Sequence, residues 1–301
     1  MVLSIDGGGC RGAIPVVILA RLERHIGRPL RRHFDLIAGT STGALVAAAV
    51  AAEVPMAELV VRWPALARDV FSGPGPIAVL RSLLREGPSR PAYDPAPLAA
   101  AAERIVGRRT LGSLSGATML FAYDVETARP WVAKSWHPAY RDLSLTDVLL
   151  ASCAAPGYFP GRVVAGRALI DGGFAANNPA ACALAEAARF EGGDTSKVRL
   201  LSLGTGASPS PITASDIAEW GMLEWAPRAI TELLEAQVAA ADYQCAQLLG
   251  ERYLRLQPEL PRHLRAMDAA ENVAGLMDAA RQFLEAGAEK ELLDWFGVVA
   301  R

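Results

Sequence analysis

Gly39-Thr40-Ser41-Thr42-Gly43 is the stretch of the sequence that decides the fold. It joins an apolar run typical of a strand, residues 34–38, to an alanine-rich run typical of a helix, residues 44–52. A serine between two glycines at such a junction indicates a sharp turn that exposes the hydroxyl above the edge of a sheet. The following helix directs the positive end of its dipole and its free N–H groups toward the same place. The stretch therefore predicts that Ser41 is a nucleophile, although a glycine-rich turn without chemical function would show the same pattern.

A second glycine-rich turn lies near the start of the chain, in Asp6-Gly7-Gly8-Gly9-Cys10-Arg11-Gly12. An apolar run precedes it and another, Ala13 to Leu22, follows, so the pattern predicts a strand, a turn and a helix. Successive glycines let neighbouring N–H groups converge on one anion. An acyl-transfer enzyme needs such donors for the oxyanion of its tetrahedral intermediate, and losing one donor costs about 2.7–4 kcal/mol.

The same turn also satisfies the dinucleotide-binding pattern G-x-G-x-x-G through Gly7, Gly9 and Gly12. That pattern further requires an acidic residue at the end of the second strand, where it holds a ribose. Here the acid of the second strand, Asp35, lies at the wrong end. A Walker A loop is excluded because no Gly-Lys-Ser/Thr follows. A non-catalytic nucleotide-binding module that uses the loop from Gly7 to Gly12 remains the alternative hypothesis.

A carboxylate ends a third apolar run, in Leu169-Ile170-Asp171-Gly172-Gly173. A hydroxyl nucleophile needs a base within hydrogen-bond reach, and the two glycines let another segment come close. The residues that follow predict a helix with Asn178 as its N-cap and Pro179 at its first position. We therefore expect Asp171 on a strand-to-helix connection, at the side of the sheet where ligands bind, rather than in an Asp-Gly hairpin turn.

In this order the three motifs resemble those of the patatin-like phospholipases. Two further stretches strengthen the resemblance: residues 151–160 (ASCAAPGYFP) are similar to the family's Ser/Thr-x-Ala-Ala-Pro-x-x-Phe segment, and residues 201–206 (LSLGTG) to its later strand ending in Gly-Thr-Gly. The resemblance covers roughly residues 1–206. It implies a three-layer α/β/α fold with a mostly parallel central sheet and a helical cap. It also implies an enzyme that hydrolyses carboxylic ester bonds of phospholipids or other lipids without a metal or organic cofactor.

The resemblance assigns roles to residues. It implies that Ser41 is the nucleophile and that Asp171 is its only partner, so that the two form a dyad that acts through an acyl-enzyme. One departure is that Ala44 stands where many relatives have a second glycine. The N–H groups expected to line the oxyanion hole are those of Gly8, Gly9 and Cys10. The residues expected to support these groups are Gly7, Arg11, Gly12, Gly39, Gly43, Gly172 and Gly173.

The histidines bear on whether a dyad or a triad is present. An α/β-hydrolase triad runs Ser, then Asp or Glu, then His along the chain, and of the four histidines only His263 follows Asp171. His263 lies in a polar, basic stretch without the glycines expected around a catalytic imidazole, so we expect a surface residue. A Ser-Asp-His esterase that uses His263 is the remaining alternative. With the carboxylate as the only base, activity should fall in acid as Asp171 becomes protonated.

Composition is consistent with an α/β enzyme of 301 residues. A hydrophobic content of 51% supports a sizeable core, and a formal charge of −2 gives no general attraction to a nucleic acid polymer. We expect no signal peptide and no membrane span, since the longest strongly apolar run, residues 44–52, is far shorter than about 20 residues. The four cysteines lack metal-ligand or disulfide spacing, so most should be reduced core residues. Cys10, beside a helix N-terminus and Arg11, could instead be acidified.

We expect a single domain that spans residues 1–301, in the cytoplasm and peripheral to the membrane when active, with a homo-oligomer left open. Residues 53–98 are interrupted by proline and glycine, which indicates a cap over the site or a plain structural insertion. Within them, Ile77 to Arg85 predicts a short amphipathic helix that could contact lipid. The other expected elements are a β-α-β-α unit over residues 1–52, strands over residues 117–125, 131–136 and 198–203, helices over residues 145–151 and 180–190, and a mostly helical part over residues 207–301.

Arginines cluster at three places in the sequence. Solvated helix ends are the usual explanation, and phosphate recognition, of a lipid head group or a nucleotide, is the alternative. Some bacterial relatives of patatin are antiphage effectors that a cyclic dinucleotide switches on to degrade the cell membrane. The size of this chain resembles those stand-alone effectors, which implies a cyclic dinucleotide as activator. The clusters are Arg28 with Arg31 and Arg32, Arg104 with Arg108 and Arg109, and Arg262 with Arg265.

Overall fold

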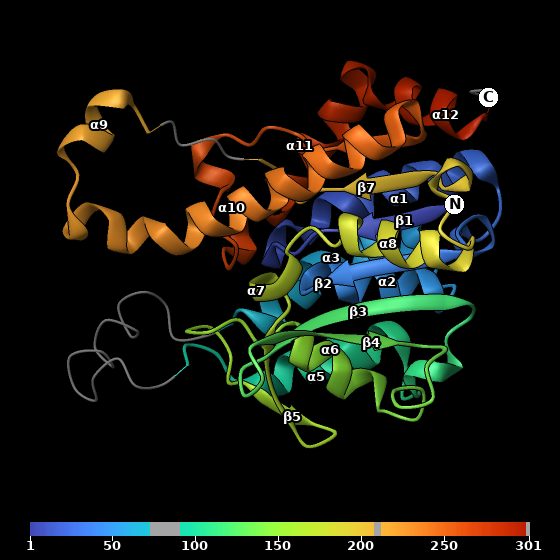
Figure 1. Ribbon diagram of the computed structural model, residues 1–301, viewed down its shortest axis with the longest axis horizontal. Coiled ribbons are helices and arrows are strands. Elements are labelled where there is room, and N and C mark those ends of the chain that lie inside the picture. Colours follow the sequence, from blue (N-terminus) through green and yellow to red (C-terminus); the bar gives the residue numbers. More distant parts are fainter. Residues whose placement is uncertain (73–90, 208–211, 299–301) are drawn as a thin grey trace.

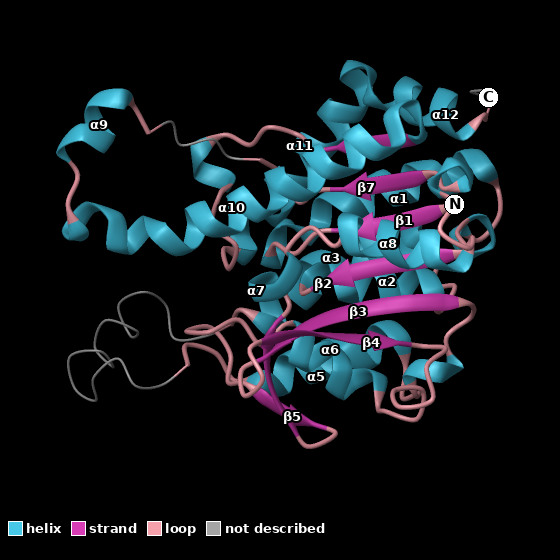
Figure 2. Ribbon diagram, viewed as in Figure 1, coloured by secondary structure: helices cyan, strands magenta, loops and turns pink. Residues whose placement is uncertain are grey.

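The computed structural model of the protein describes residues 1–72, 91–207 and 212–298, and these residues form an eight-stranded mixed sheet between layers of helices (Figures 1 and 2). The strands follow the order β5-β6-β3-β2-β1-β7-β8, and β4 pairs with β3. Their bounds are β1 (Val2–Ile5), β2 (Leu36–Thr40), β3 (Ala117–Asp124), β4 (Arg129–Lys134), β5 (Arg162–Val164), β6 (Arg167–Asp171), β7 (Leu200–Leu203) and β8 (Tyr253–Leu256).

Helices cover both faces of the sheet because side chains alternate along each strand. In β1, Leu3 and Ile5 belong to one hydrophobic core, whereas Val2 belongs to a second core on the opposite face. The first core contains α1 (Ala13–Ile26), α2 (Thr42–Ala51), α3 (Met56–Val70), α5 (Pro95–Val106), α6 (Leu145–Ser152), α11 (Val273–Phe283) and α12 (Glu289–Phe296). The second is covered by α8 (Ala180–Phe190) and α10 (Met222–Leu249). The three-layer α/β/α prediction is confirmed.

Parallel pairing places the ends of three strands at one side of the sheet. Strand β1 lies between β2 and β7, and Ile5 is in register with Gly39 on one side and Leu203 on the other. The loops that leave the three strands therefore begin side by side. This is the side on which an open α/β sheet binds ligands, and it holds both the Gly7–Gly12 loop and Ser41.

The end of strand β6 reaches the same side of the sheet because β6 pairs with β3. Strand β4 occupies one edge of β3 from Met119 to Asp124, so β2 and β6 must share the opposite edge. Thr40, the last residue of β2, is opposite Phe121, and Asp171, the last residue of β6, is opposite Ala122. Because β2 is parallel to β3 and β6 is antiparallel, the two strands run toward each other and end tip to tip.

Most expected elements are present near their expected bounds. The β-α-β-α unit over residues 1–52 and the strand pair β3 and β4 are confirmed. The helix expected to begin at Pro179 begins at Ala180, after the short helix α7 (Gly173–Ala176). Pro179 takes the N-cap position, and Asn178 Oδ1 accepts a hydrogen bond from the Ala180 N–H at 3.0 Å, so the asparagine still satisfies a free amide.

The C-terminal part of the described chain is mostly helical, as expected, but not helical throughout. The mostly helical part over residues 207–301 also contains strand β8, which its four residues were too few to predict. The amphipathic helix expected over residues 77–85 lies outside the described residues, and the single domain with a cap over residues 53–98 stays a prediction. Within the described ranges, no helix has the length and hydropathy needed to cross a membrane.

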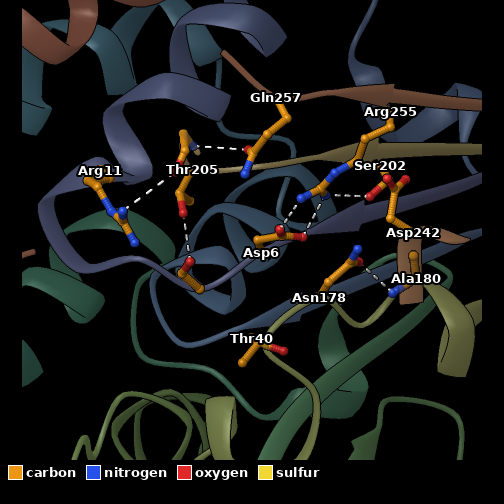
Figure 3. Close-up of polar contacts among 12 residues, drawn as sticks. Asp6, Arg11, Thr40, Asn178, Ala180, Ser202, Thr205, Asp242, Arg255 and Gln257 are labelled. Atoms are coloured by element: carbon orange, nitrogen blue, oxygen red, sulfur yellow. Dashed lines mark hydrogen bonds and ion pairs between the residues drawn. The ribbon is translucent and has the colours of Figure 1, made fainter. Parts of the chain in front are cut away.

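A buried ion pair ties β8 to the end of β1. The Arg255 guanidinium donates to both Asp6 oxygens, at 3.0 and 2.5 Å, and to Ser202 Oγ at 2.8 Å (Figure 3). Both charged side chains are almost fully buried. A bidentate contact of this kind fixes geometry as well as charge. It therefore anchors the residue from which the Gly7–Gly12 loop departs.

Removing the arginine alone should leave an unpaired buried carboxylate. We expect Arg255→Met to lower the free energy of unfolding by about 3–5 kcal/mol, the usual penalty for breaking a buried pair. The measurement is the denaturation midpoint of the full chain. The double variant Asp6→Asn/Arg255→Met should recover a large part of this loss, and an equal loss in both variants would contradict the assignment.

Candidate active site

Ser41 sits on a strained turn between β2 and α2. Its φ of 54° and ψ of −125° lie outside the ordinary region for a non-glycine residue. The flanking glycines are required by close packing: a Cβ on Gly39 would lie 2.3 Å from the Gly43 carbonyl oxygen, and a Cβ on Gly43 would lie 2.3 Å from the Ile5 carbonyl oxygen. The sharp turn predicted from the sequence is therefore present, and it fixes the side chain of Ser41 at the end of the sheet.

The Ser41 hydroxyl meets the carboxylate of Asp171 directly. Ser41 Oγ donates to Asp171 Oδ2 at 2.7 Å, and the Gly173 N–H donates to Asp171 Oδ1, also at 2.7 Å. Burial raises the pKa of Asp171 to about 6, against the opposing effect of these two hydrogen bonds. The carboxylate is thus a stronger base than an exposed aspartate and is still mostly ionised at neutral pH.

Ser152 joins the segments that carry these two side chains, and its role was not predicted. Its Oγ accepts a hydrogen bond from the Ser41 N–H at 2.9 Å and donates to the Phe121 carbonyl at 2.6 Å. Its own carbonyl accepts the Gly172 N–H at 3.2 Å. The residue is fully buried. Ser152 opens the Ser-x-Ala-Ala-Pro stretch noted in the sequence, but a hydroxyl that bridges two loops can be identified only in the folded chain.

The Gly7–Gly12 loop offers two amide donors beside Ser41. Within the part of the chain that the structure describes, the N–H groups of Gly8 and Gly9 have no hydrogen-bond partner, and both residues line the same pocket as Ser41. The Cys10 N–H instead donates to the Met267 carbonyl at 2.7 Å. In this conformation Cys10 therefore does not serve as the expected oxyanion donor.

The Cys10 side chain also differs from the expectation that it could be acidified. Burial, with smaller contributions from Asp268 and Glu271, raises the pKa of the thiol to about 12. Cys10 is an inert core residue, as are Cys153 and Cys245, whereas the fourth cysteine, Cys182, is exposed.

The glycine loop is held by the Thr205 side chain, which Figure 3 shows, and by the backbone of Asn177. Thr205 Oγ1 donates to the Gly7 carbonyl at 2.7 Å, and the Gly7 N–H donates to the Asn177 carbonyl at 3.1 Å. Arg11 is buried, and its Nε donates to the Gly8 carbonyl at 3.4 Å. These contacts fix the direction of the free amides before any ligand arrives.

The remaining supporting glycines have close neighbours within the site. A Cβ on Gly12 would lie 2.4 Å from Thr42 Oγ1, and one on Gly172 would lie 2.2 Å from the Phe121 carbonyl oxygen. A Cβ on Gly173 would come within 3.1 Å of the Asp171 carboxylate. At Gly12 and Gly172 another segment of the site therefore occupies the space of a side chain, whereas at Gly173 the nearest atom belongs to Asp171, two residues earlier.

An apolar pocket opens beside Ser41. Helix α3 contributes its buried face, α5 contributes Leu98 and Ile105, and the loop after α6 contributes Tyr158 and Phe159. Among the described residues that line the pocket, only Phe174 is exposed, at 41%, and we call the side of the pocket at Phe174 and Leu234, the latter from α10, its mouth. The wall residues supplied by α3 and its end are Trp63, Leu66, Ala67, Val70 and Phe71.

Neither the triad nor a metal site is formed by the described residues. His263 lies in a short helical turn, Arg262–Leu264, and no histidine is among the described residues that line the pocket. The direct contact of Ser41 with Asp171 also leaves no space for an imidazole between them. Nor does any group of three or more His, Cys, Asp or Glu in the described part of the chain come together to hold a metal ion.

A strained serine beside a buried carboxylate, free amides and an apolar pocket is the arrangement expected for an acyl hydrolase. A family model described as Patatin-like phospholipase matches residues 3–184. A cGAMP-activated phospholipase from Pseudomonas aeruginosa (strain BWHPSA011 / Pa011) is 31% identical over 277 residues, which cover 89% of this chain and 82% of the relative. A Vibrio cholerae protein with the same name is 30% identical and is aligned over 100% of this chain and 95% of its own length. Patatin-like protein 2 of Arabidopsis thaliana is 32% identical over 268 residues, which cover 74% of this chain and 64% of the relative.

The chain therefore belongs to the patatin-like phospholipase family, as the sequence motifs predicted. It is a lipid acyl hydrolase. The alternative hypothesis of a non-catalytic nucleotide-binding module is not supported.

Loss of the Ser152 hydroxyl should misplace Ser41 without removing it. We expect Ser152→Ala to lower kcat about 10- to 100-fold with little change in KM, since the cost of one unsatisfied buried polar group is about 1–3 kcal/mol. Ser152→Thr, which keeps the hydroxyl, should restore most of the rate. Steady-state kinetics on an ester substrate provides the measurement.

Ser135 offers a matched control for this variant. Its Oγ accepts the Thr118 N–H and donates to the Gly116 carbonyl, the same two-bond pattern at the opposite end of β3. Ser135→Ala should lose comparable stability and keep its kcat. If both variants lost kcat equally, Ser152 would have only a general structural role.

Ionised Asp171 should destabilise the fold. Its folded pKa of about 6 exceeds the unfolded value, so the native state binds the proton more tightly and stability falls as pH rises between about 4 and 6. Above that window the cost is about 3 kcal/mol, from about 1.4 kcal/mol for each pKa unit. Asp171→Asn should therefore be more stable than the wild type at pH 7.5, with the advantage vanishing below pH 4. Thermal unfolding of both proteins between pH 4 and pH 7.5 measures this difference in stability. A variant less stable than the wild type at pH 7.5 would refute the prediction.

Proposed function

We propose that this protein cleaves carboxylic ester bonds of phospholipids and related lipids with a Ser41–Asp171 dyad, through an acyl-enzyme. The observation that carries the proposal is the 2.7 Å hydrogen bond from Ser41 Oγ to the buried Asp171 carboxylate. The apolar pocket beside it suits an acyl chain, and the free amides of Gly8 and Gly9 suit an oxyanion. The reaction so written needs no metal or organic cofactor.

Acylation begins with attack of Ser41 Oγ on the ester carbonyl carbon. Asp171 Oδ2 accepts the hydroxyl proton as the C–O bond forms, and the negative charge moves to the carbonyl oxygen, where the Gly8 and Gly9 N–H groups stabilise it. Collapse of the tetrahedral intermediate breaks the bond to the alcohol. Asp171 returns its proton to the departing alkoxide, so that the alcohol, a lysophospholipid when the substrate is a phospholipid, leaves with its hydroxyl protonated.

Deacylation repeats these steps with water as the nucleophile. Asp171 accepts a proton from the water as it attacks the acyl-enzyme carbonyl, and the same amides hold the second oxyanion. Ser41 then leaves and recovers the proton, and the fatty acid is released. A base with a pKa near 6 suits both halves, because it is ionised at neutral pH and still accepts a proton more readily than an ordinary aspartate.

The pocket walls explain why a lipid chain would enter. Trp63, Val70, Leu98 and Ile105 face it from α3 and α5, and burying each methylene of a chain there is worth about 0.8 kcal/mol. We assign α3 to the cap expected over residues 53–98, and α5, which begins within that range and ends beyond it, supplies a further wall of the pocket. The polar head group of the substrate would remain outside, toward the mouth at Phe174 and Leu234.

We further propose that a cyclic dinucleotide activates the enzyme, in the cytoplasm, to degrade membrane lipid in antiphage defence. The support is the similarity to relatives named cGAMP-activated phospholipase, which extends over almost the whole chain. Two of the three arginine clusters do not locate the activator: Arg31 donates to backbone carbonyls, whereas Arg104 and Arg108 pair with Asp69 and Glu103. These contacts favour the interpretation that those clusters are structural.

A fluorophosphonate probe tests the dyad. The active wild type should label covalently, Ser41→Ala should not label, and Asp171→Asn should label at least 100-fold more slowly. Mass spectrometry of products from defined phosphatidylcholine should show free fatty acid and lysophospholipid. Labelling that persists in Ser41→Ala would disprove the assignment of the nucleophile.

The activator is tested in the same assay. Hydrolysis of phosphatidylcholine vesicles should rise at least tenfold with one member of a panel of cyclic dinucleotides that includes cGAMP, and His263→Ala should respond like the wild type. Equal rates with and without every member of the panel would remove the activation proposal and leave the hydrolase proposal intact.

A further inference from the structure

An arm formed by α9 (Ala214–Glu219) and the first half of α10 projects from the body of the protein. Figures 1 and 2 show that it projects on the side toward which the arrowheads of β1, β2 and β7 point. We call residues 213–235 the arm. Four large apolar side chains of α10 are exposed on it: Met222 at 80%, Leu223 at 86%, Ile230 at 61% and Leu233 at 64%. Clustered exposed side chains of this kind mark an interaction surface.

These four side chains form one face of the helix. At 3.6 residues per turn they fall within an arc of about 100°. Glu224, Glu232 and Glu235 fall on the opposite side of the same turns, together with Arg228. The first half of α10 is therefore an amphipathic helix with its apolar face toward solvent.

The tip of the arm carries an aromatic pair. Trp220 and Trp225 contact edge to face, with ring centroids 5.4 Å apart, and the Arg228 guanidinium lies 4.7 Å from the centre of the Trp220 ring. Ile217, on α9, adds another exposed apolar side chain. Tryptophan beside arginine at the end of an apolar face is typical of helices that lie in the head-group region of a bilayer.

The apolar face leads to the active-site pocket. Leu234 follows Leu233 on the same helix and lines the pocket mouth with Phe174, which is itself partly exposed. A lipid that leaves a membrane for Ser41 would thus meet apolar surface from the arm to the pocket. This continuity favours a bilayer as the occupant of the face over a second copy of the chain, which would cover the entrance.

The charge of the arm specifies the kind of bilayer. Residues 213–235 contain five carboxylates, Asp216, Glu219, Glu224, Glu232 and Glu235, and one basic residue, Arg228. Anionic head groups would repel such a segment. Binding to this surface must therefore come from apolar insertion and should gain nothing from anionic lipid.

We propose that the apolar face of α10 in the arm inserts into the interface of a weakly charged bilayer and guides lipid to the pocket mouth at Leu234. The inference rests on the proposed lipid hydrolase function and adds the docking surface to it. It predicts that hydrolysis of a lipid in a membrane requires the arm, whereas hydrolysis of a soluble short-chain ester does not.

Vesicle flotation tests the docking surface without catalysis. The full-length Ser41→Ala protein, with and without cGAMP, is mixed with vesicles of phosphatidylcholine and phosphatidylethanolamine. We expect it to float in at least one condition, and adding Met222→Ser and Leu223→Ser should lower the bound fraction at least tenfold. The matched control away from the apolar face, Glu219→Gln on α9 with Glu232→Gln on the polar side of α10, should bind zwitterionic vesicles as its parent does. Equal binding by parent and apolar-face variant, or no binding of the parent in either condition, overturns the proposal.

Two further readouts separate the alternatives. With Ser41 intact, Met222→Ser/Leu223→Ser should hydrolyse vesicles at least tenfold more slowly and a soluble ester within twofold of the wild type. If the wild type cleaves no ester, the hydrolase proposal fails, while flotation still decides the docking surface.

Binding that requires phosphatidylglycerol and is lost in 0.5 M salt would place the contact on a basic surface and overturn the inference. A fall in oligomer mass with unchanged vesicle binding would assign the face to a second copy and would also overturn it.

Discussion

The candidate site depends on how three strands share the edges of β3. Strand β4 occupies one edge, so β2 and β6 must meet on the other, and the register leaves no gap between Thr40 and Asp171. The next residue after β2 is Ser41. The distance from its hydroxyl to the carboxylate is therefore set by backbone hydrogen bonds of the sheet, which are rigid, rather than by a flexible loop.

Close backbone approach makes this arrangement possible and also determines its electrostatics. Glycines at the elbow and after Asp171 let chain segments pack where a Cβ would lie within about 2.3 Å of another segment's backbone. The same packing excludes water from Asp171 and raises its pKa toward neutrality. A carboxylate that would be a feeble base in water thereby becomes suited to accept a proton from an alcohol, at a cost in stability of the fold.

The features of this site that depend on neighbouring residues could be predicted from the sequence, whereas those that depend on contacts between distant segments could not. The elbow at Ser41, the Gly7–Gly12 loop and the strand that ends in Asp171 are each recognisable from neighbouring residues, and they were placed correctly. The tip-to-tip meeting of β2 and β6 was not predicted, because strand pairing is decided by segments far apart in the chain. The engagement of the Cys10 amide was missed for the same reason: its acceptor, the Met267 carbonyl, lies about 250 residues away and belongs to no motif.

The pH dependence of acylation tests the central claim, direct proton transfer from Ser41 to Asp171, most directly. The rate of the acylation burst with a soluble activated ester should follow one ionisation near pH 6, fall below it, and be unchanged in His263→Ala. An acylation rate in Asp171→Asn equal to that of the wild type, with the same pH profile, would contradict the account.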